Sequence, residues 1–256
     1  MNKNFIKSIK SAEESNGQFF TVNFGDTPFK FYFEEDACNW VWNYKYIYRA
    51  QTIDIKSELN TSLEKNKIAL INYFYNFIIQ DISNLNSYLS KSITSSLDIG
   101  AGIGLFDLFL AQILGPNTSF DLIEVNELLE IEHVTNNPED TKQIETGNTI
   151  KPVETLKKLM IKNKAHNINI IESNEINQYF DNKKYDLILS FRSWGFLYDI
   201  DLYKDFVINT LNPDGIVITD LSIFDDSIDK FSQIFKDVTL INEAPNNKRF
   251  IGKYIK

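Results

Sequence analysis

The sequence predicts an α/β protein: a seven-stranded sheet with helices between its strands, preceded by a smaller subdomain of one hairpin and helices. Short apolar runs alternate with helical patterns from residue 95 onward, which is typical of a parallel sheet covered by helices. A glycine-rich turn joins the first run to the first helix, in the stretch SLDIGAGIGLFDLFLAQILGPNTSFDLIE that begins at Ser96. The last two apolar runs flank the turn sequence PNNK at residues 245–248, so we expect a terminal hairpin whose last strand is antiparallel.

The composition limits the classes of protein to which the chain can belong. Its 256 residues, 43% of them apolar, suffice for a large domain at residues 93–256 and a subdomain at residues 1–92. The net charge of −9 argues against nucleic acid or an anionic membrane surface as the main partner. The single cysteine, Cys38, excludes an intramolecular disulfide, and residues 1–14 are too polar for a secretory leader. No apolar run approaches the ~18 residues of a membrane span, so we expect a cytoplasmic protein and leave its oligomeric state open.

The N-terminal subdomain is predicted from aromatic-rich segments. The runs FFTVNF and FKFYF flank the turn sequence Gly25-Asp26-Thr27-Pro28 and predict a β-hairpin within residues 17–34. Residues 40–48 place aromatic side chains on two helical faces, which suits either a lid that stacks on a sugar or adenine, or packing against the core. The apolar stripe that follows predicts a long helix at residues 57–89.

The core elements are bounded by turn and breaker residues. Gly115-Pro116 and the NPDG sequence at residues 212–215 end two helices, and Pro152 suits the first turn of another. Residues 126–150 are polar and lack periodicity, so we interpret them as a functional insertion. The strands are predicted at residues 95–99, 120–124, 168–171, 185–190, 216–220, 238–242 and 250–255, and the helices at 105–114, 152–165, 202–211 and 227–235.

The spacing of glycines around the first turn distinguishes two classes of ligand. A dinucleotide fingerprint, G-x-G-x-x-G, requires its third small residue at position 105, which is Leu105 here. Asp98, two residues before the first glycine, suits a cationic ligand better than a pyrophosphate. Glu124, at the end of the second strand, can accept hydrogen bonds from both hydroxyls of a ribose.

Residues 98–104, with the sequence DIGAGIG, resemble the first motif, D/E-x-G-x-G-x-G, of the class I S-adenosylmethionine-dependent methyltransferases. The resemblance implies a Rossmann-like methyltransferase sheet and S-adenosylmethionine as the cofactor. Asn174 stands where the family has an acid that bonds the adenine amino group, and the sequence LNPDG at residues 211–215 resembles the family's L-x-P-G-G. The implied cofactor-binding residues are Asp98, Gly100, Ala101, Gly102, Gly104, Glu124, Asn174 and Ser190.

The acceptor is expected at the carboxyl end of the fourth strand, in the sequence SFRSWGFLY at residues 190–198. The segment has no Pro-Pro pair, which disfavours methylation of base amino groups, and the sequence has no cluster of metal ligands, so we expect no catalytic metal. It resembles bacterial methyltransferases of glycans or small metabolites. Trp194 can offer a flat face to a sugar or form a wall of the core. Arg192 can bind a phosphate or carboxylate, or be an ordinary surface arginine. Tyr198 is the last residue of the segment and a further candidate for the acceptor site.

The choice of a general base rests on few residues. An alcohol acceptor needs its proton removed, and the sequence contains only two histidines. His133 lies in the insertion and is our first candidate, whereas His166 precedes the third strand, at the wrong end of the sheet. Asp220, at the end of the fifth strand, is the second candidate.

Three functions remain open at this point. The first is O-methylation of a small molecule such as a sugar, a sugar phosphate or a glycan precursor. The second is an NAD(P)-dependent oxidoreductase, which Leu105 and the terminal hairpin disfavour. The third is a non-catalytic binding module of the methyltransferase fold, which the complete glycine motif and Glu124 disfavour.

Overall fold

The computed structural model describes residues 19–24, 27–32, 78, 81–89, 92–124, 152–172, 182–244 and 247–256. The aromatic segment at 40–48, the insertion at 126–150 and most of the helix expected at 57–89 lie outside these ranges. Of that helix, residues 78 and 81–85 are helical, whereas residues 86–88 form a turn, so the helix does not extend to residue 89 as expected. The division of the chain between residues 92 and 93 stays a prediction.

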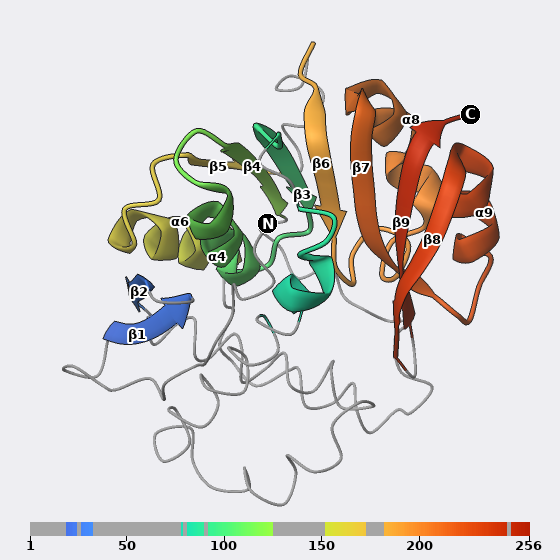
Figure 1. Cartoon of the computed structure of the whole chain (residues 1–256). Coiled ribbons are helices and arrows are strands. Elements are labelled where there is room, and N and C mark those ends of the chain that lie inside the picture. Colours follow the sequence, from blue (N-terminus) through green and yellow to red (C-terminus); the bar gives the residue numbers. More distant parts are fainter. Residues whose placement is uncertain are drawn as a thin grey trace, which may run out of the picture.

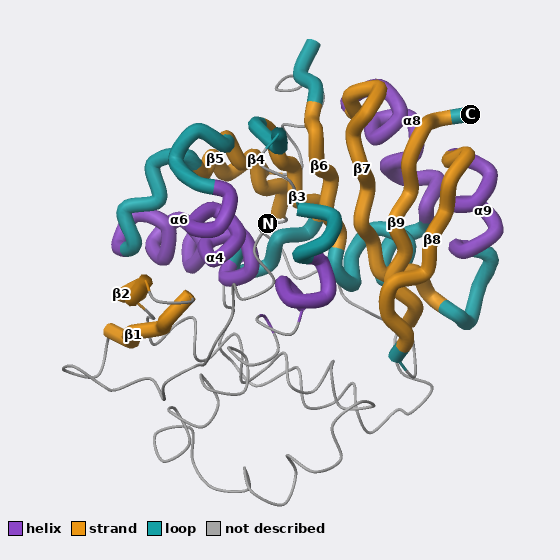
Figure 2. Tube along the Cα trace, in the orientation of Figure 1, coloured by secondary structure: helices purple, strands orange, loops and turns teal. Residues whose placement is uncertain are grey.

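Seven strands form one mixed sheet in the spatial order β5-β4-β3-β6-β7-β9-β8 (Figure 1). They are β3 (Ser95–Ile99), β4 (Ser119–Glu124), β5 (Ile168–Glu172), β6 (Tyr185–Ser190), β7 (Leu211–Ser222), β8 (Phe235–Glu243) and β9 (Asn247–Ile255). Neighbouring strands from β5 to β7 are parallel, and β9 is antiparallel to β7 and to β8. Figure 2 shows β9 running between these two strands. The predicted α/β fold, a seven-stranded sheet with an antiparallel hairpin at its carboxyl-terminal end, is confirmed.

Helices cover both faces of this sheet. They are α4 (Leu105–Leu114), α6 (Pro152–Lys162), α8 (Ile200–Thr210) and α9 (Ser227–Ile234). Leu187 and Leu189 of β6 belong to a buried cluster with α4 and α6, whereas Ile188 between them belongs to a second cluster with α8 and α9. Because side chains alternate along a strand, these clusters lie on opposite faces (Figure 1). Within the described ranges, no helix is long and apolar enough to cross a membrane.

Several element boundaries differ from the prediction by one to three residues, such as the starts of β8 and β9, and the start of β7 differs by five. Two of the differences have clear local reasons. Helix α6 ends at Lys162 rather than residue 165, because Lys164 adopts a left-handed conformation with φ 55° and the Ala165 N–H donates to the Met160 carbonyl at 3.0 Å. Strand β7 begins at Leu211 rather than 216, because Leu211 already pairs with Tyr185 of β6. The NPDG sequence at residues 212–215 therefore forms a bulge within β7 instead of a loop before it.

The predicted N-terminal hairpin is confirmed in its backbone. Strands β1 (Phe19–Phe24) and β2 (Thr27–Tyr32) pair antiparallel, and the Phe24–Thr27 pair leaves a two-residue connection at residues 25–26. Pro28 lies in β2 rather than in the turn. The hairpin is thus tighter than the four-residue turn sequence suggests.

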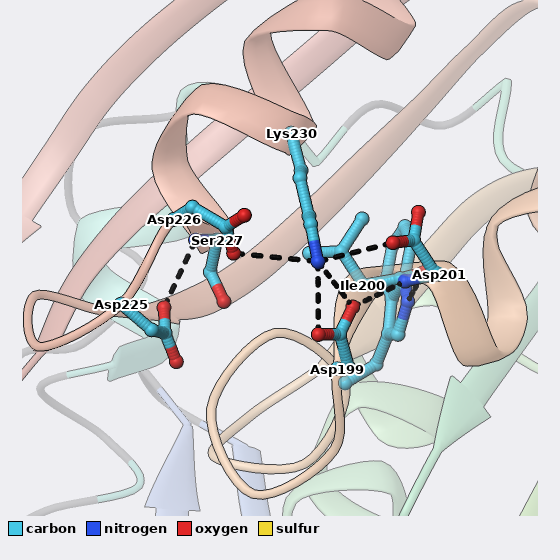
Figure 3. A network of polar contacts seen from close by, with 8 residues as sticks. Asp199, Ile200, Asp201, Asp225, Asp226, Ser227 and Lys230 are labelled. Carbon is cyan, nitrogen blue, oxygen red and sulfur yellow. Dashed lines mark hydrogen bonds and ion pairs between the residues drawn. The ribbon is translucent and has the colours of Figure 1, made fainter.

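A partly buried lysine joins the start of α8 to α9. The Nζ of Lys230, on α9, lies 2.9 Å from Asp199 Oδ2, 3.0 Å from Asp201 Oδ2 and 3.3 Å from Asp226 Oδ1 (Figure 3). Asp199 also caps α8, because its side chain accepts a 2.8 Å hydrogen bond from the Asp201 N–H. Asp199 ends the segment that leaves β6, so these contacts fix that segment to two helices.

Candidate active site

The candidate site lies at the edge of the sheet where three parallel strands end. Strands β4, β3 and β6 are neighbours, and their last residues are Glu124, Ile99 and Ser190. The carboxyl ends of parallel strands share one edge of a sheet, and ligands of open α/β sheets bind there. The structure therefore brings the glycine turn, the acid of β4 and the segment after β6 to one place.

The glycine turn is held in position by the end of β4. The N–H groups of Gly100 and Ala101 both donate to the Ile123 carbonyl, at 2.9 and 3.1 Å. The Gly102 N–H donates to Glu124 Oε2 at 2.5 Å, and the Glu124 side chain is buried. Each of these N–H groups belongs to a turn that requires positive φ, with values of 79° at Gly100 and 60° at Gly102. Glu124, which was predicted to bind the ribose, thus also holds the glycine turn in position.

Two of the motif glycines, Gly104 and Gly100, lie against different parts of the protein. A Cβ on Gly104 would meet Leu156 Cδ1 at 2.4 Å and Met160 Cε at 2.7 Å, so its missing side chain lets α6 pack against the start of α4. Gly100 lies against Ser193, in the segment that follows β6. Gly104 therefore has a packing role that accounts for its presence, in addition to the predicted role beside the cofactor.

Two buried aspartates lie beneath the glycine turn. Asp98, on β3, and Asp107, in the first turn of α4, are 4% and 0% exposed. Asp98 Oδ1 and both carboxyl oxygens of Asp107 accept no hydrogen bond within the described structure. The two carboxyl groups are near enough for the protonation of one to change the pKa of the other, although they lack the geometry of a regular hydrogen bond. Burial, then Asp107 and Glu124, raises the pKa of Asp98 well above its usual range, and burial raises that of Asp107 to about 7.

Ser190, predicted to contact the cofactor, uses its hydroxyl group to join two strand ends. Its Oγ donates to the Ile99 carbonyl at 2.9 Å and accepts from the Trp194 N–H at 2.8 Å. The residue is 0% exposed. The hydroxyl of Ser190 therefore holds the segment after β6 against the end of β3, next to the glycine turn.

Trp194 lies in the core. Its side chain is 0% exposed, packs against Phe231 with ring centroids 6.3 Å apart, and donates its Nε1–H to the Ile200 carbonyl at 2.7 Å. All of these contacts belong to the face of the sheet covered by α8 and α9. Of the two interpretations of Trp194, a wall of the core fits this geometry, and a flat face for a sugar does not.

A buried ion network surrounds the end of β7. Arg249 Nε and Nη2 donate to the two carboxyl oxygens of Asp220 at 2.7 and 2.9 Å, and Nη1 donates to Asp81 at 2.6 Å. The guanidinium group also stacks on the Phe191 ring at 4.0 Å. Asp220, 0% exposed, would have to leave this network to act as a base, which disfavours that candidate. Arg192 is buried and its charge acts on Asp81, so it is not an ordinary surface arginine.

Two tyrosines lie within electrostatic reach of Glu124. Tyr198, after β6, and Tyr203, on α8, are both partly buried. Burial raises both pKa values, and the charge of Glu124 raises them further. Tyr198 is therefore a neutral phenol that can donate a hydrogen bond, and it lies on the same side of the site as the predicted ribose acid.

Some predicted residues are not placed. His133 and Asn174 lie outside the described ranges, so their roles stay predictions. His166 is exposed in the turn before β5, at the opposite end of the sheet, as predicted. Among the residues that are described, no group of three or more His, Cys, Asp or Glu side chains could hold a metal ion.

Sequence reasoning missed Asp107, Tyr203 and the Asp81–Arg249 contact. Asp107 carries a signal in hindsight, because it is the one charged residue in the apolar helix LFDLFLAQIL and comes three residues after Gly104. The contact between Asp81 and Arg249 has no local signal, since the two residues are 168 positions apart.

Comparison with known proteins finds likeness at the level of structure. No family model and no curated protein matches the chain. A putative caffeoyl-CoA O-methyltransferase from Staphylococcus aureus is 15% identical, with 82% of this chain and 99% of that chain covered and a TM-score of 0.48. For a precorrin-6y C5,15-methyltransferase from Geobacter metallireducens the identity is 16%, the coverage 68% and 86%, and the TM-score 0.46. For a putative O-methyltransferase from Klebsiella pneumoniae these values are 8%, 88% and 91%, and 0.45. At such identities and scores, the assignment of function depends on the sheet order and the site residues of this chain.

Proposed function

We propose that this chain is an S-adenosylmethionine-dependent methyltransferase. The observation that carries the proposal is the concentration of buried acids at the glycine turn: Asp98 from β3, Glu124 from β4 and Asp107 from α4. A buried carboxylate is stabilised by a cation, and the proposed donor has two positively charged groups, an ammonium and a sulfonium. The sheet order, with its reversed last strand, supports the same function.

The residues present fit this cofactor. Gly100, Ala101 and Gly102 form a turn free of large side chains, and Glu124 is a carboxylate at the end of the neighbouring strand. In our proposal the turn lies against the amino-acid end of the donor and Glu124 accepts the ribose hydroxyls. When bound, S-adenosylmethionine supplies a methyl group on a positively charged sulfur. The protein then has to orient the acceptor, exclude water and receive the proton that the acceptor loses.

We propose a small-molecule alcohol, such as a sugar or sugar phosphate, as the acceptor. Three groups near the end of β6 support this: the buried guanidinium group of Arg192 and the phenols of Tyr198 and Tyr203. Arginine suits a phosphate or carboxylate of the acceptor, and a neutral phenol suits a hydroxyl. His133 remains the proposed base, and the insertion at 126–150 a proposed wall of the acceptor site.

Calorimetry with S-adenosylmethionine and, separately, NAD tests the cofactor. We expect the full chain to bind the first ligand and not the second. Glu124→Ala should weaken binding by about 2–3 kcal/mol, because it removes a charged acceptor. Glu172→Gln is the matched control: Glu172 pairs with Glu124 in the register, at the same end of the next strand, and forms an ion pair with Lys157. Unchanged donor affinity in Glu124→Ala would contradict the proposal.

Turnover tests the reaction and its acceptor. The full chain is incubated with S-adenosylmethionine carrying a labelled methyl group and a panel of sugars and sugar phosphates. Transfer of label to a hydroxyl group supports O-methylation. Donor binding without transfer to any acceptor, including a cell extract of small molecules, would instead favour the non-catalytic module.

A further inference from the structure

We infer that Asp107 is a second acidic residue of the donor site, which together with Asp98 binds the ammonium group of the donor, and that this pair gives up one shared proton when the ammonium binds. The inference rests on the proposed function and deepens it. It names a residue outside the glycine motif and adds a proton to the binding equilibrium.

The position of the two aspartates comes first. Asp98 alternates with Leu97 and Ile99, which both belong to the cluster on the α8 and α9 face, so Asp98 faces α4. Asp107 reaches the same region from the first turn of α4, three residues after Gly104. Neither residue is exposed enough to be solvated, at 4% and 0%. Both lie directly beneath the turn that we propose for the amino-acid end of the donor.

The second observation is the lack of partners. Three of the four oxygens of this pair, Asp98 Oδ1 and both of Asp107, are buried and accept no hydrogen bond within the described structure. Buried carboxyl oxygens in folded proteins are almost always hydrogen-bonded, and exceptions often mark a binding or catalytic role. Such oxygens fit an ammonium group, which has three N–H donors and no acceptor.

The charged groups that act on the pair are negative. Glu124, from β4, is the further described group that acts on Asp98, and no described cation acts on either aspartate. On α6, which packs against the same turn, Glu154, Lys157 and Lys158 are exposed. Adjacent carboxyl groups away from water cannot all ionise, so the pair retains a proton near neutral pH. Burial accordingly raises the pKa of Asp107 to about 7.

Binding of an ammonium group changes this balance. The ammonium keeps its three protons and brings a positive charge to the pair, which then ionises fully. The O–H bond that holds the shared proton breaks, and solvent or buffer takes up the proton. The second negative charge that forms on the pair is balanced by the charge of the ammonium, so the net charge of the site is conserved. In S-adenosylhomocysteine the sulfur is a neutral thioether and the adenosine is neutral, so with that ligand the effect depends on the amino-acid end alone.

Two ligands that differ in this end test the inference. S-adenosylhomocysteine carries the ammonium group, and 5′-methylthioadenosine lacks the whole amino-acid part. Each is titrated into the full chain by calorimetry at about pH 7.5, just above the pKa of Asp107, where the pair holds about one proton, in two buffers of different ionisation enthalpy. We expect release of up to one proton with S-adenosylhomocysteine and none with 5′-methylthioadenosine.

The variant Asp107→Asn should weaken binding of S-adenosylhomocysteine by about tenfold or more, change binding of 5′-methylthioadenosine by less than about twofold, and reduce proton release. Asp229→Asn is the matched control, because Asp229 is also an acid in the first turn of a helix but is exposed. It should leave both affinities and the proton count unchanged.

Several results would overturn the inference. Equal weakening of both ligands would give Asp107 a structural role only, and unchanged affinity with undiminished proton release would remove it from the site. The proton count of the unmodified chain needs no variant, so a count of zero overturns the inference even where Asp107→Asn fails to fold. If the unmodified chain binds neither ligand nor S-adenosylmethionine, the proposed function itself fails.

Discussion

Gly100 and Ser193 are in contact at the edge of the sheet, where the segments that follow β3 and β6 begin. A Cβ on Gly100 would lie 2.1 Å from Ser193 Oγ and 2.4 Å from Ser193 Cβ, far inside van der Waals contact. The Ser193 backbone also anchors the next turn, because its carbonyl accepts from the Leu197 and Tyr198 N–H groups at 2.8 and 3.0 Å. The absence of a side chain at Gly100 is therefore required by the protein's own segment after β6.

Gly100→Ala should destabilise the fold and weaken donor binding, since it adds a clash with Ser193 to the strain of a φ of 79°. Gly115→Ala is the control: its φ is 92°, yet a Cβ there would meet nothing within 4 Å. We expect about 1–3 kcal/mol from Gly115→Ala and a larger loss from Gly100→Ala, measured by urea denaturation. Ser193→Gly in the Gly100→Ala background should restore part of that loss. Equal losses in the two alanine variants would show that the contact with Ser193 is unimportant.

Arg249→Met should cost about 3–5 kcal/mol of stability, because it leaves the buried carboxylates of Asp81 and Asp220 without their cation. Arg249→Lys keeps the charge but cannot reproduce the fork onto Asp220, so we expect an intermediate loss. Chemical denaturation measures both. Lys157→Met removes an exposed ion pair with Glu172 and should change stability by less than about 1 kcal/mol. A similarly small change in Arg249→Met would contradict the prediction.

Trp194→Ala should lower stability by about 3–5 kcal/mol, because it opens a cavity beside Phe231 and removes the Nε1–H bond to Ile200. Affinity for the donor, measured per folded molecule, should stay close to that of the parent. Melting temperature and calorimetry on this one variant are sufficient. If its melting temperature is unchanged while the acceptor KM rises, Trp194 belongs to the acceptor site after all.

Asp107→Asn should change how stability depends on pH. In the folded protein burial raises the pKa of Asp107 from 3.8 to about 7, so the stability contributed by the protonated group is complete below about pH 4 and is lost as pH rises through 7. Asparagine is neutral throughout, so the variant should gain about 1–3 kcal/mol over the parent between pH 5 and pH 8. Urea denaturation at both pH values measures the difference. The stability of Asp229→Asn should depend on pH as that of the parent does. The same pH dependence in Asp107→Asn and the parent would contradict the burial of a titrating group.

The order of strands and helices could be predicted from the sequence because its signals are local. The strand at 95–99, the helix at 105–114 and the strand at 185–190 begin and end where apolar runs and glycines place them. The NPDG sequence misled the prediction of β7, since turn residues also suit a bulge and the pairing of Leu211 with Tyr185 is decided by the neighbouring strand.

The parts of the site that were missed depend on tertiary contacts. The spacing of glycines predicted the turn and Glu124, but the pattern gives Asp107 the appearance of an ordinary first-turn acid. The burial of Trp194 likewise follows from how α8 and α9 pack, which no motif records. The residue types at the strand ends predicted which functional groups lie at this edge of the sheet. Tertiary packing determines which of those side chains are accessible.

The ion network at Arg249 also bears on when the fold can be completed. Arg249 lies on β9, a strand that enters between β7 and β8, and it binds Asp81, 168 positions earlier. A ribosome making the chain from its amino end releases Asp81 long before its partner exists. Until β9 emerges, the carboxylates of Asp81 and Asp220 have no guanidinium group to bind, and β7 has an open edge. The sheet can therefore be completed only after β9 has been made, so a chain that stalls or is truncated before β9 presents an unpaired strand edge that can join to other chains.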